Sequence, residues 1–120
     1  MSSEKLQSIA FKWIEAFNNK DLDKLLCLYD EQAVHFSPKL KIKNPATNGL
    51  ITGKDALREW WQTAFDTIAG LQYKLSTLTT NEDRVFMEYT RITDQDAPLL
   101  VAEVLDIRDN KIVASRVYHG

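Results

Sequence analysis

The sequence predicts an α+β fold, because helix-like and strand-like periodicities occupy separate parts of the chain. Up to Gly70, apolar residues mostly recur every three or four positions, which is the spacing of one helical face. From Leu71 onward, most segments alternate between apolar and polar residues and are separated by short turn-forming stretches, as in antiparallel strands. Helices followed by strands indicate a sheet that wraps around its helices.

Length and charge exclude several classes of protein. The chain has 120 residues, the size of one domain, so we expect residues 1–120 to form a single domain. Its 15 lysines and arginines against 17 acidic residues give a formal net charge of -2, which argues against nucleic-acid and membrane-surface partners. The segment MSSEKLQSIAFKW has no long apolar run and no cleavage site, so a cytoplasmic location is expected.

Three helices are predicted before Gly70. The first runs from Ser3 to Asn19, with an apolar face formed by Leu6, Ile9, Ala10, Trp13 and Phe17. The second follows Asp21, and its apolar side consists of Leu22, Leu25, Leu26 and Tyr29; Cys27 in this pattern is predicted to be a buried structural thiol. The third begins at Thr52 in the capping-box pattern T-G-K-D, with a stripe of Ala56, Leu57, Trp60, Trp61, Ala64, Phe65 and Ile68.

Two short segments between the second and third helices change to a period of two. Residues 33–37 predict a first strand, with His35 and Ser37 on one face. Residues 39–43 alternate lysine with leucine and isoleucine, which predicts an edge strand. We favour the interpretation that these lysines protect the edge from aggregation; the alternative is an anion-binding rim.

The strand at residues 99–107 organises the predicted site. Its alternation places Glu103 on the same face as Leu99, Val101, Leu105 and Ile107. A carboxylate in an apolar row is costly unless it is protonated, hydrogen-bonded or paired, so Glu103 indicates a functional cavity. The alternative is an edge-strand glutamate that reaches water.

Strand pairing determines which residues can contact Glu103. Further strands are predicted at residues 71–80, 85–93 and 112–119, and a five-residue turn at 94–98 places Tyr89 opposite Glu103 and Arg91 opposite Val101. A hydrogen bond from Tyr89 would suit a proton donor. An ion pair with Arg91 would more often be structural, and both arrangements remain open.

The chain as a whole resembles the nuclear transport factor 2-like superfamily, in particular its SnoaL-like branch. The resemblance is carried by the order helix, NNKDLDKL, helix, DEQAVHFSP, then TGKDALREWW and a last strand ending DNKIVASRVYH. It implies that a strongly curved mixed or antiparallel sheet wraps the three N-terminal helices and forms a cone-shaped, apolar pocket. Homodimers built on the outer face of the sheet are frequent among such proteins.

Two enzyme branches of the superfamily test this resemblance. At the positions of the ketosteroid isomerase base and oxyanion tyrosine, this chain has Ser37 and Trp13, although the protonated acid of that family matches Glu103. The ketosteroid isomerase set is therefore incomplete. The limonene epoxide hydrolase triad is replaced as well, which excludes that mechanism, because its positions hold Arg91, Tyr89 and Val117.

The resemblance also implies which residues line the pocket. They are Trp13, Phe17, His35, Ser37, Trp61, Phe65, Tyr89, Arg91, Glu103, Ser115, Val117 and His119. A plain two-residue turn at Asp109-Asn110 would instead place Arg116 opposite Glu103. The family register requires a β-bulge in this hairpin, and we favour that register.

Two functions agree with this pocket. The first is a cofactor-independent isomerase, cyclase or lyase that moves a proton on a small apolar carbonyl or enol compound. In this reaction His35 is the candidate base, and Glu103 together with Tyr89 or Trp13 is the candidate proton donor. The second is a non-catalytic domain for binding a small apolar or aromatic molecule or for dimerisation, with Glu103 and Arg91 as a buried pair. We expect no metal site, because the two histidines, the single cysteine and the acids show no ligand spacing, and no cofactor.

A homodimer is expected through the outer face of the sheet. The residues that alternate with the Glu103 row would expose apolar surface on a protein with no other cover for it. They are Leu100, Ala102 and Val104, together with Val113 of the next strand.

Overall fold

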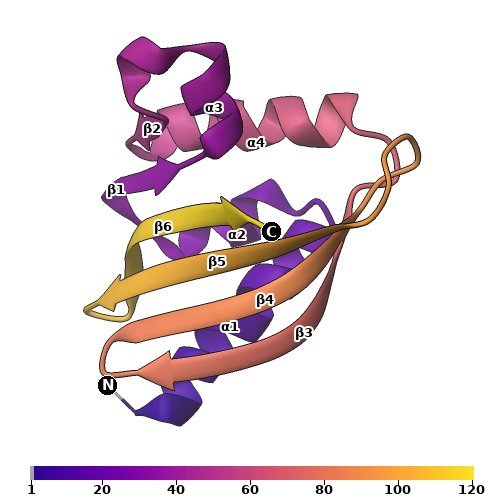
Figure 1. Ribbon diagram of the computed structural model, residues 1–120. Coiled ribbons are helices and arrows are strands. Elements are labelled where there is room, and N and C mark those ends of the chain that lie inside the picture. Colours follow the sequence, from indigo (N-terminus) through magenta and orange to yellow (C-terminus); the bar gives the residue numbers. More distant parts are fainter. Residues whose placement is uncertain (1) are drawn as a thin grey trace.

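The computed structural model describes residues 2–120, and two long helices lie against its sheet (Figure 1). Helix α1 (Ser3–Asn18) packs along strands β3 (Gln72–Asn81) and β4 (Arg84–Ile92). Helix α4 (Lys54–Thr67) packs over β1 (Tyr29–Phe36) and β2 (Leu50–Thr52). Shorter helical segments connect these elements: α2 (Leu22–Cys27), α3 (Pro38–Lys43) and the 3-10 turn η1 (Pro45–Thr47). Within residues 2–120, no helix has both the length and the apolar character needed to cross a membrane.

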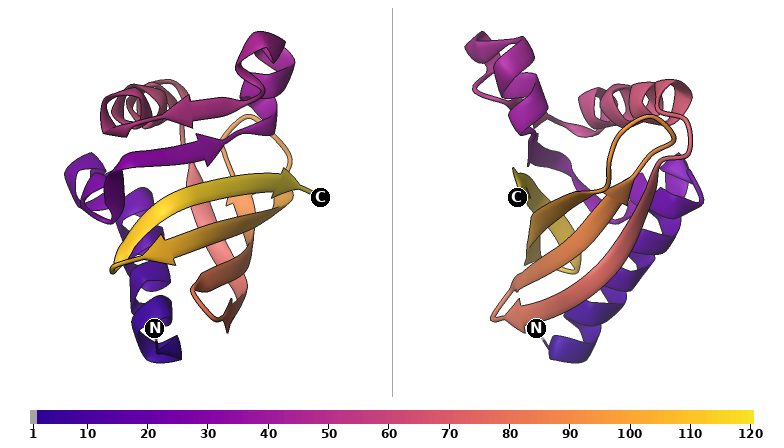
Figure 2. Two further views of the ribbon diagram at one scale, coloured as in Figure 1. Left: turned by 90° about the vertical axis from the view of Figure 1, so that its left-hand side faces the viewer. Right: turned by 45° about the vertical axis from the view of Figure 1, so that its right-hand side comes forward.

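Six strands form one mixed sheet in the order β2-β1-β6-β5-β4-β3. Neighbouring strands are antiparallel except β1 and β6, which run parallel. Figure 2 shows the sheet bending around α1, so the predicted α+β class with a curved mixed sheet is confirmed. The strands are β1 (Tyr29–Phe36), β2 (Leu50–Thr52), β3 (Gln72–Asn81), β4 (Arg84–Ile92), β5 (Leu99–Arg108) and β6 (Lys111–His119).

The core lies between the inner face of the sheet and the helices. In the inward row of β5, Val101, Leu105 and Ile107 are buried, and Glu103 among them is only 1% exposed. Leu100, on the opposite face, is 52% exposed. The predicted orientation of this strand is therefore confirmed, and Glu103 does not reach water at a sheet edge.

Residues 38–43 form helix α3, so the predicted edge strand is wrong. Ser37 is the N-cap and accepts a hydrogen bond from the Leu40 amide at 3.4 Å, while Pro38 occupies the first turn with its fixed φ. These two local signals outweigh the alternation of lysines with apolar residues. The short strand β2 occupies that edge of the sheet instead.

Three other local predictions are also corrected. The N-cap of α4 is Gly53, at a φ of 88° and without a side-chain cap, because Thr52 belongs to β2 rather than to a capping box. Tyr29 opens β1 instead of extending the second helix. Cys27 ends α2 and is exposed, so it is not a buried thiol.

Strands β4 and β5 pair two residues away from the predicted register. Met87 lies opposite Glu103, Tyr89 lies opposite Val101, and Arg91 lies opposite Leu99. A shift of two residues keeps every side chain on its predicted face, because strand side chains alternate with a period of two. Tyr89 therefore approaches Glu103 diagonally rather than directly.

The hairpin between β5 and β6 has the bulge that the family register requires. The pairing shifts between Asp106 and Ile107, which places Ser115 opposite Leu105 and Val117 opposite Glu103. Ser115 and Val117 thus share the inner face with Glu103. The alternative register, with Arg116 opposite Glu103, is wrong.

Candidate functional site

A cavity lies between the inner face of the sheet and helices α1 and α4. Its volume is about 90 Å³. That is room for several waters or one small organic molecule. Six aromatic side chains line it, namely Trp13, Phe17, Trp60, Trp61, Tyr73 and Tyr89.

Glu103 is the acidic residue in this wall, and it is held at one oxygen only. Its Oε1 accepts a hydrogen bond from the Tyr89 hydroxyl at 2.8 Å. Its Oε2 is buried and has no hydrogen-bond partner among the residues that the structure describes. Burial raises the pKa of Glu103 to about 8, although the hydrogen bond from Tyr89 acts in the opposite direction. At pH 7 the carboxyl is therefore mostly protonated.

The tyrosines beside Glu103 remain hydrogen-bond donors at neutral pH. The Tyr73 and Tyr89 rings stack with centroids 4.1 Å apart. Burial, followed by the negative charge that Glu103 carries when ionised, raises the pKa of both hydroxyls above the ordinary value for tyrosine. Tyr89 therefore fixes the carboxyl without competing with it for ionisation.

His35 faces Glu103 from strand β1 at the end of a buried hydrogen-bond chain. The His35 Nδ1 atom lies 2.6 Å from the Ser115 hydroxyl and 3.9 Å from Glu103 Oε2. Ser115 in turn accepts a hydrogen bond from the Tyr29 hydroxyl at 3.0 Å, and Tyr29 accepts one from the Trp13 indole at 3.0 Å. This chain fixes the orientation of the His35 ring from behind.

At pH 7 the side chains of His35 and Glu103 are both mostly uncharged. Burial lowers the pKa of His35 to about 4, so the imidazole carries no charge there. Since Glu103 is mostly protonated at the same pH, their contact at 3.9 Å is not an ion pair in the resting protein. Two uncharged proton carriers thus face one cavity.

Arg91 also borders the cavity, but its ion pair is not with Glu103. Its Nη1 lies 3.7 Å from the Oδ2 atom of Asp96, in the loop between β4 and β5. The alternative in which Arg91 neutralises Glu103 is therefore not the arrangement seen here. The hydrogen bond from Tyr89 is the other predicted arrangement, and it is present.

The fold brings most of the predicted pocket residues together. Ser115 is separate from the wall and touches His35 from behind. Ser37 caps α3, and Phe65 packs edge-on against Phe17 at 5.1 Å, so neither lines the cavity. The predicted residues that do line it are Trp13, Phe17, His35, Trp61, Tyr89, Arg91, Glu103, Val117 and His119.

Several residues of the site were not predicted from the sequence. Tyr73 could have been found, because alternation on β3 gives it the same face as Leu75, which packs on the core. Tyr29 was assigned to a helix, and Lys39 to a strand, so the wrong local structure concealed both. Trp60 was predicted only as part of an apolar helical stripe.

Comparison with known proteins identifies the family. The model of the SnoaL-like domain family matches residues 10–115. The chain belongs to the SnoaL-like domain family. No curated protein matches its sequence.

Solved structures show that this SnoaL-like domain has the nuclear transport factor 2-like fold that the sequence resemblance implied. A SnoaL-like protein of unknown function from Burkholderia thailandensis is 24% identical with a TM-score of 0.85, over 100% of this chain and 98% of that chain. A protein proposed to be a polyketide cyclase, from Sinorhizobium meliloti, is 18% identical with a TM-score of 0.80, over 98% and 100%.

A third solved structure contains a small molecule. It is a protein with a ketosteroid isomerase-like fold from Catenulispora acidiphila, in complex with trimethylamine; it is 17% identical with a TM-score of 0.72, over 92% of this chain and 83% of that chain. In the SnoaL-like domain described here, residues 2–120 contain no group of three or more His, Cys, Asp and Glu side chains that could hold a metal ion.

Proposed function

We propose that this SnoaL-like domain is a cofactor-independent isomerase or cyclase that moves a proton on a small apolar carbonyl compound. The observation that carries this proposal is the Oε2 atom of Glu103, which is buried in the wall of the cavity and has no hydrogen-bond partner within residues 2–120. Tyr89 holds the other oxygen in place. A neutral carboxyl in that position can give its proton to the carbonyl oxygen of a bound compound.

His35 is the base in this proposal. Burial keeps its imidazole neutral, as a base must be before it accepts a proton. For Nε2 to accept that proton, Nδ1 must carry the ring hydrogen and donate it to Ser115, 2.6 Å away. Ser115 is therefore a positioning residue that holds the orientation of the His35 ring, and in this tautomer its oxygen accepts from both Tyr29 and His35 Nδ1.

The proton transfer uses the two groups together. His35 removes a proton from the carbon beside the carbonyl group, so that the C–H bond breaks, while Glu103 protonates the carbonyl oxygen and an enol forms. The two neutral groups thereby become an imidazolium and a carboxylate, whose nearest ring nitrogen and oxygen are 3.9 Å apart in the resting structure. Their attraction in a buried site offsets part of the cost of charging each group. The imidazolium then gives its proton to a different carbon of the conjugated enol while the Glu103 carboxylate takes back the enol proton, which completes an isomerisation and restores both neutral groups.

Solvent deuterium exchange into cyclohexanone, followed by proton NMR, tests this function. The wild type is expected to exchange the protons beside the carbonyl faster than buffer does. Glu103→Gln should reduce that rate by about 10²-fold or more, because it removes the acid. The rate should be greatest between pH 4 and pH 8, since His35 with a pKa of about 4 must be neutral and Glu103 with a pKa of about 8 must be protonated.

Glu59→Gln is the matched control, because Glu59 is exposed on α4 and does not line the cavity. It should exchange as fast as the wild type. Exchange no faster than buffer, or full activity in Glu103→Gln, would reject the proposed reaction. Binding of cyclohexanone without exchange would instead favour a non-catalytic ligand-binding domain.

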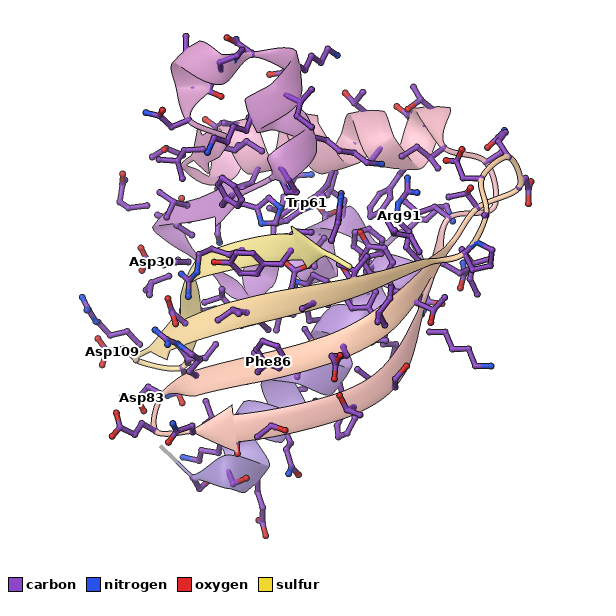
Figure 3. All side chains as sticks on the ribbon, viewed as in Figure 1. Asp30, Trp61, Asp83, Phe86, Arg91 and Asp109 are labelled. Carbon is purple, nitrogen blue, oxygen red and sulfur yellow. The ribbon has the colours of Figure 1, made fainter. Side chains whose placement is uncertain are left out.

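We also propose a homodimer through the outer face of the sheet. On this face Leu100 is 52% exposed, and Phe86 and Tyr118 are also exposed; Figure 3 shows Phe86 on the side of the sheet away from α1. Val104 was expected to be exposed here, but it is only 7% exposed, because Phe86 and Arg116 flank it on the neighbouring strands. Leu100 is therefore the better probe of the interface.

Sedimentation measures this association directly. The wild type at tens of micromolar is expected at twice the monomer mass, and Leu100→Asp is expected as a monomer, because a carboxylate would be buried in an apolar interface. Ile42→Asp, on the exposed side of α3, is the matched control and should remain a dimer. A monomeric wild type would contradict the proposal.

A further inference from the structure

Three basic side chains border the cavity, and the proton transfer does not use them. Arg91 comes from β4, Lys39 from α3 and His119 from the end of β6. Arg91 and Trp61 both lie beneath α4 in the view of Figure 3. Arg91 is 9% exposed, whereas Lys39 and His119 are exposed. The basic residues therefore extend from the buried wall of the cavity to its mouth.

The guanidinium of Arg91 is only weakly neutralised by the protein. Within residues 2–120 its one ion pair is the contact with Asp96 at 3.7 Å, and the Asp96 side chain is 67% exposed. A guanidinium has five N–H donors in a planar fork that suits a carboxylate, and a single distant partner leaves most of them free. A buried charge in this state favours a further anion.

The three basic groups also affect one another. Burial lowers the pKa of Lys39, and the positive charge of Arg91 lowers it further, while Asp96 opposes this effect. Burial, then Lys39 and Arg91, lowers the pKa of His119, so that at pH 7 His119 is mostly neutral. Two positive charges against the one negative charge of Asp96 leave about one unit of positive charge, which suits a singly charged anion.

We infer that the ligand of this cavity is a small aromatic monocarboxylate, bound through its carboxylate by Arg91 and Lys39. Its ring would lie among the aromatic side chains of the wall, above all Trp13 and Trp61. If the proposed function holds, the carbonyl compound also carries this carboxylate at one end, and its reacting carbonyl group faces Glu103 at the other end. The inference rests on the proposed function for that last point only.

Tryptophan fluorescence can measure this binding without any reaction, because all three tryptophans line the cavity. The probes are phenylacetate and phenylacetamide, which have similar shapes but differ in charge. Phenylacetate is expected to bind the wild type at least about tenfold more tightly, and the difference should shrink in high salt. Arg91→Gln should remove that preference and leave phenylacetamide binding unchanged.

Arg108→Gln is the control for loss of an arginine, because Arg108 is exposed at the end of β5 and does not line the cavity. It should retain the preference. Equal binding of the two probes by the wild type, binding of neither, or a preference that survives in Arg91→Gln would overturn the inference. If Arg91→Gln does not fold, the exposed Lys39→Gln should weaken phenylacetate binding by about threefold, and no change would overturn it.

Two further outcomes separate the possible explanations. Phenyl phosphate, a dianion near neutral pH, should bind more weakly than phenylacetate, and tighter binding would reject a monocarboxylate site. If the wild type prefers phenylacetate but exchanges no deuterium into cyclohexanone, the proposed reaction is rejected and the inferred carboxylate site is retained.

Discussion

When the pH is raised from 5 to 8, the free energy of unfolding of Glu103→Gln is expected to rise by about 3 kcal/mol relative to that of the wild type. The folded pKa of Glu103 is about 8, raised by burial, whereas an unfolded glutamate titrates near ~4.3. The stability that the neutral acid contributes is therefore fully present below ~4.3 and is lost as the pH rises through 8. Glutamine has no proton to lose, and its oxygen can still accept from Tyr89.

Urea melts of both proteins at pH 5 and pH 8 measure this difference. At pH 5 the two free energies of unfolding should agree within about 1 kcal/mol, because an amide replaces a neutral acid of the same shape. Glu59→Gln should track the wild type at both pH values, since Glu59 is exposed. A Glu103→Gln protein clearly less stable than the wild type at pH 8 would mean that Glu103 is ionised in the fold.

The sequence was sufficient to predict the inner face of the sheet and the position of the acid on it. Strand alternation alone places Glu103 between Val101 and Leu105, and the structure confirms that this row is buried. The bulge that brings Ser115 and Val117 to the same face came from the family resemblance, because a bulge has no signal in the local pattern. The fold class and the face of the sheet on which Glu103 lies were thus predictable from the sequence.

The parts that the sequence did not predict depend on competing local signals and on loop geometry. Alternation of lysines predicted a strand at residues 39–43, but the cap at Ser37 and the following proline produced α3, which brings Lys39 to the cavity. The loop at residues 93–98 shifted the β4–β5 register by two, which kept Tyr89 within reach of Glu103 and left Arg91 beside Asp96. The periodicity of a strand determines which face of the sheet each side chain occupies. The connecting loop determines which residues of neighbouring strands pair on that face.

Glu103 and His35 should set opposite pH limits on stability. Glu103 is uncharged in the fold and loses stability as the pH rises, because its unfolded form ionises first. His35 is also uncharged in the fold, and it loses stability as the pH falls, because its unfolded form protonates first. A site made of two neutral proton carriers is therefore most stable, and most ready for the proposed transfer, in the range between them.

His35→Phe tests the acid limit. When the pH is lowered from 7.5 to 4.5, its free energy of unfolding should rise by about 2 kcal/mol relative to that of the wild type. The folded pKa of His35 is about 4 against ~6.5 when unfolded, so its contribution is present above ~6.5 and lost as the pH falls toward 4. At pH 7.5 the variant should be at most about 1 kcal/mol less stable, since phenylalanine keeps the packing on Trp61 and Ser115 keeps its bond from Tyr29.

Urea melts at the two pH values, with deuterium exchange into cyclohexanone on the same samples, separate the roles of the ring. His119→Phe is the control, because the exposed His119 should change the pH dependence far less. A folded His35→Phe protein that exchanges deuterium at the wild-type rate would return His35 to a packing role. If wild type and His35→Phe lose the same free energy between pH 7.5 and pH 4.5, the folded protein does not hold His35 neutral, and a charged imidazole beside Glu103 replaces the neutral pair on which the proposed mechanism depends.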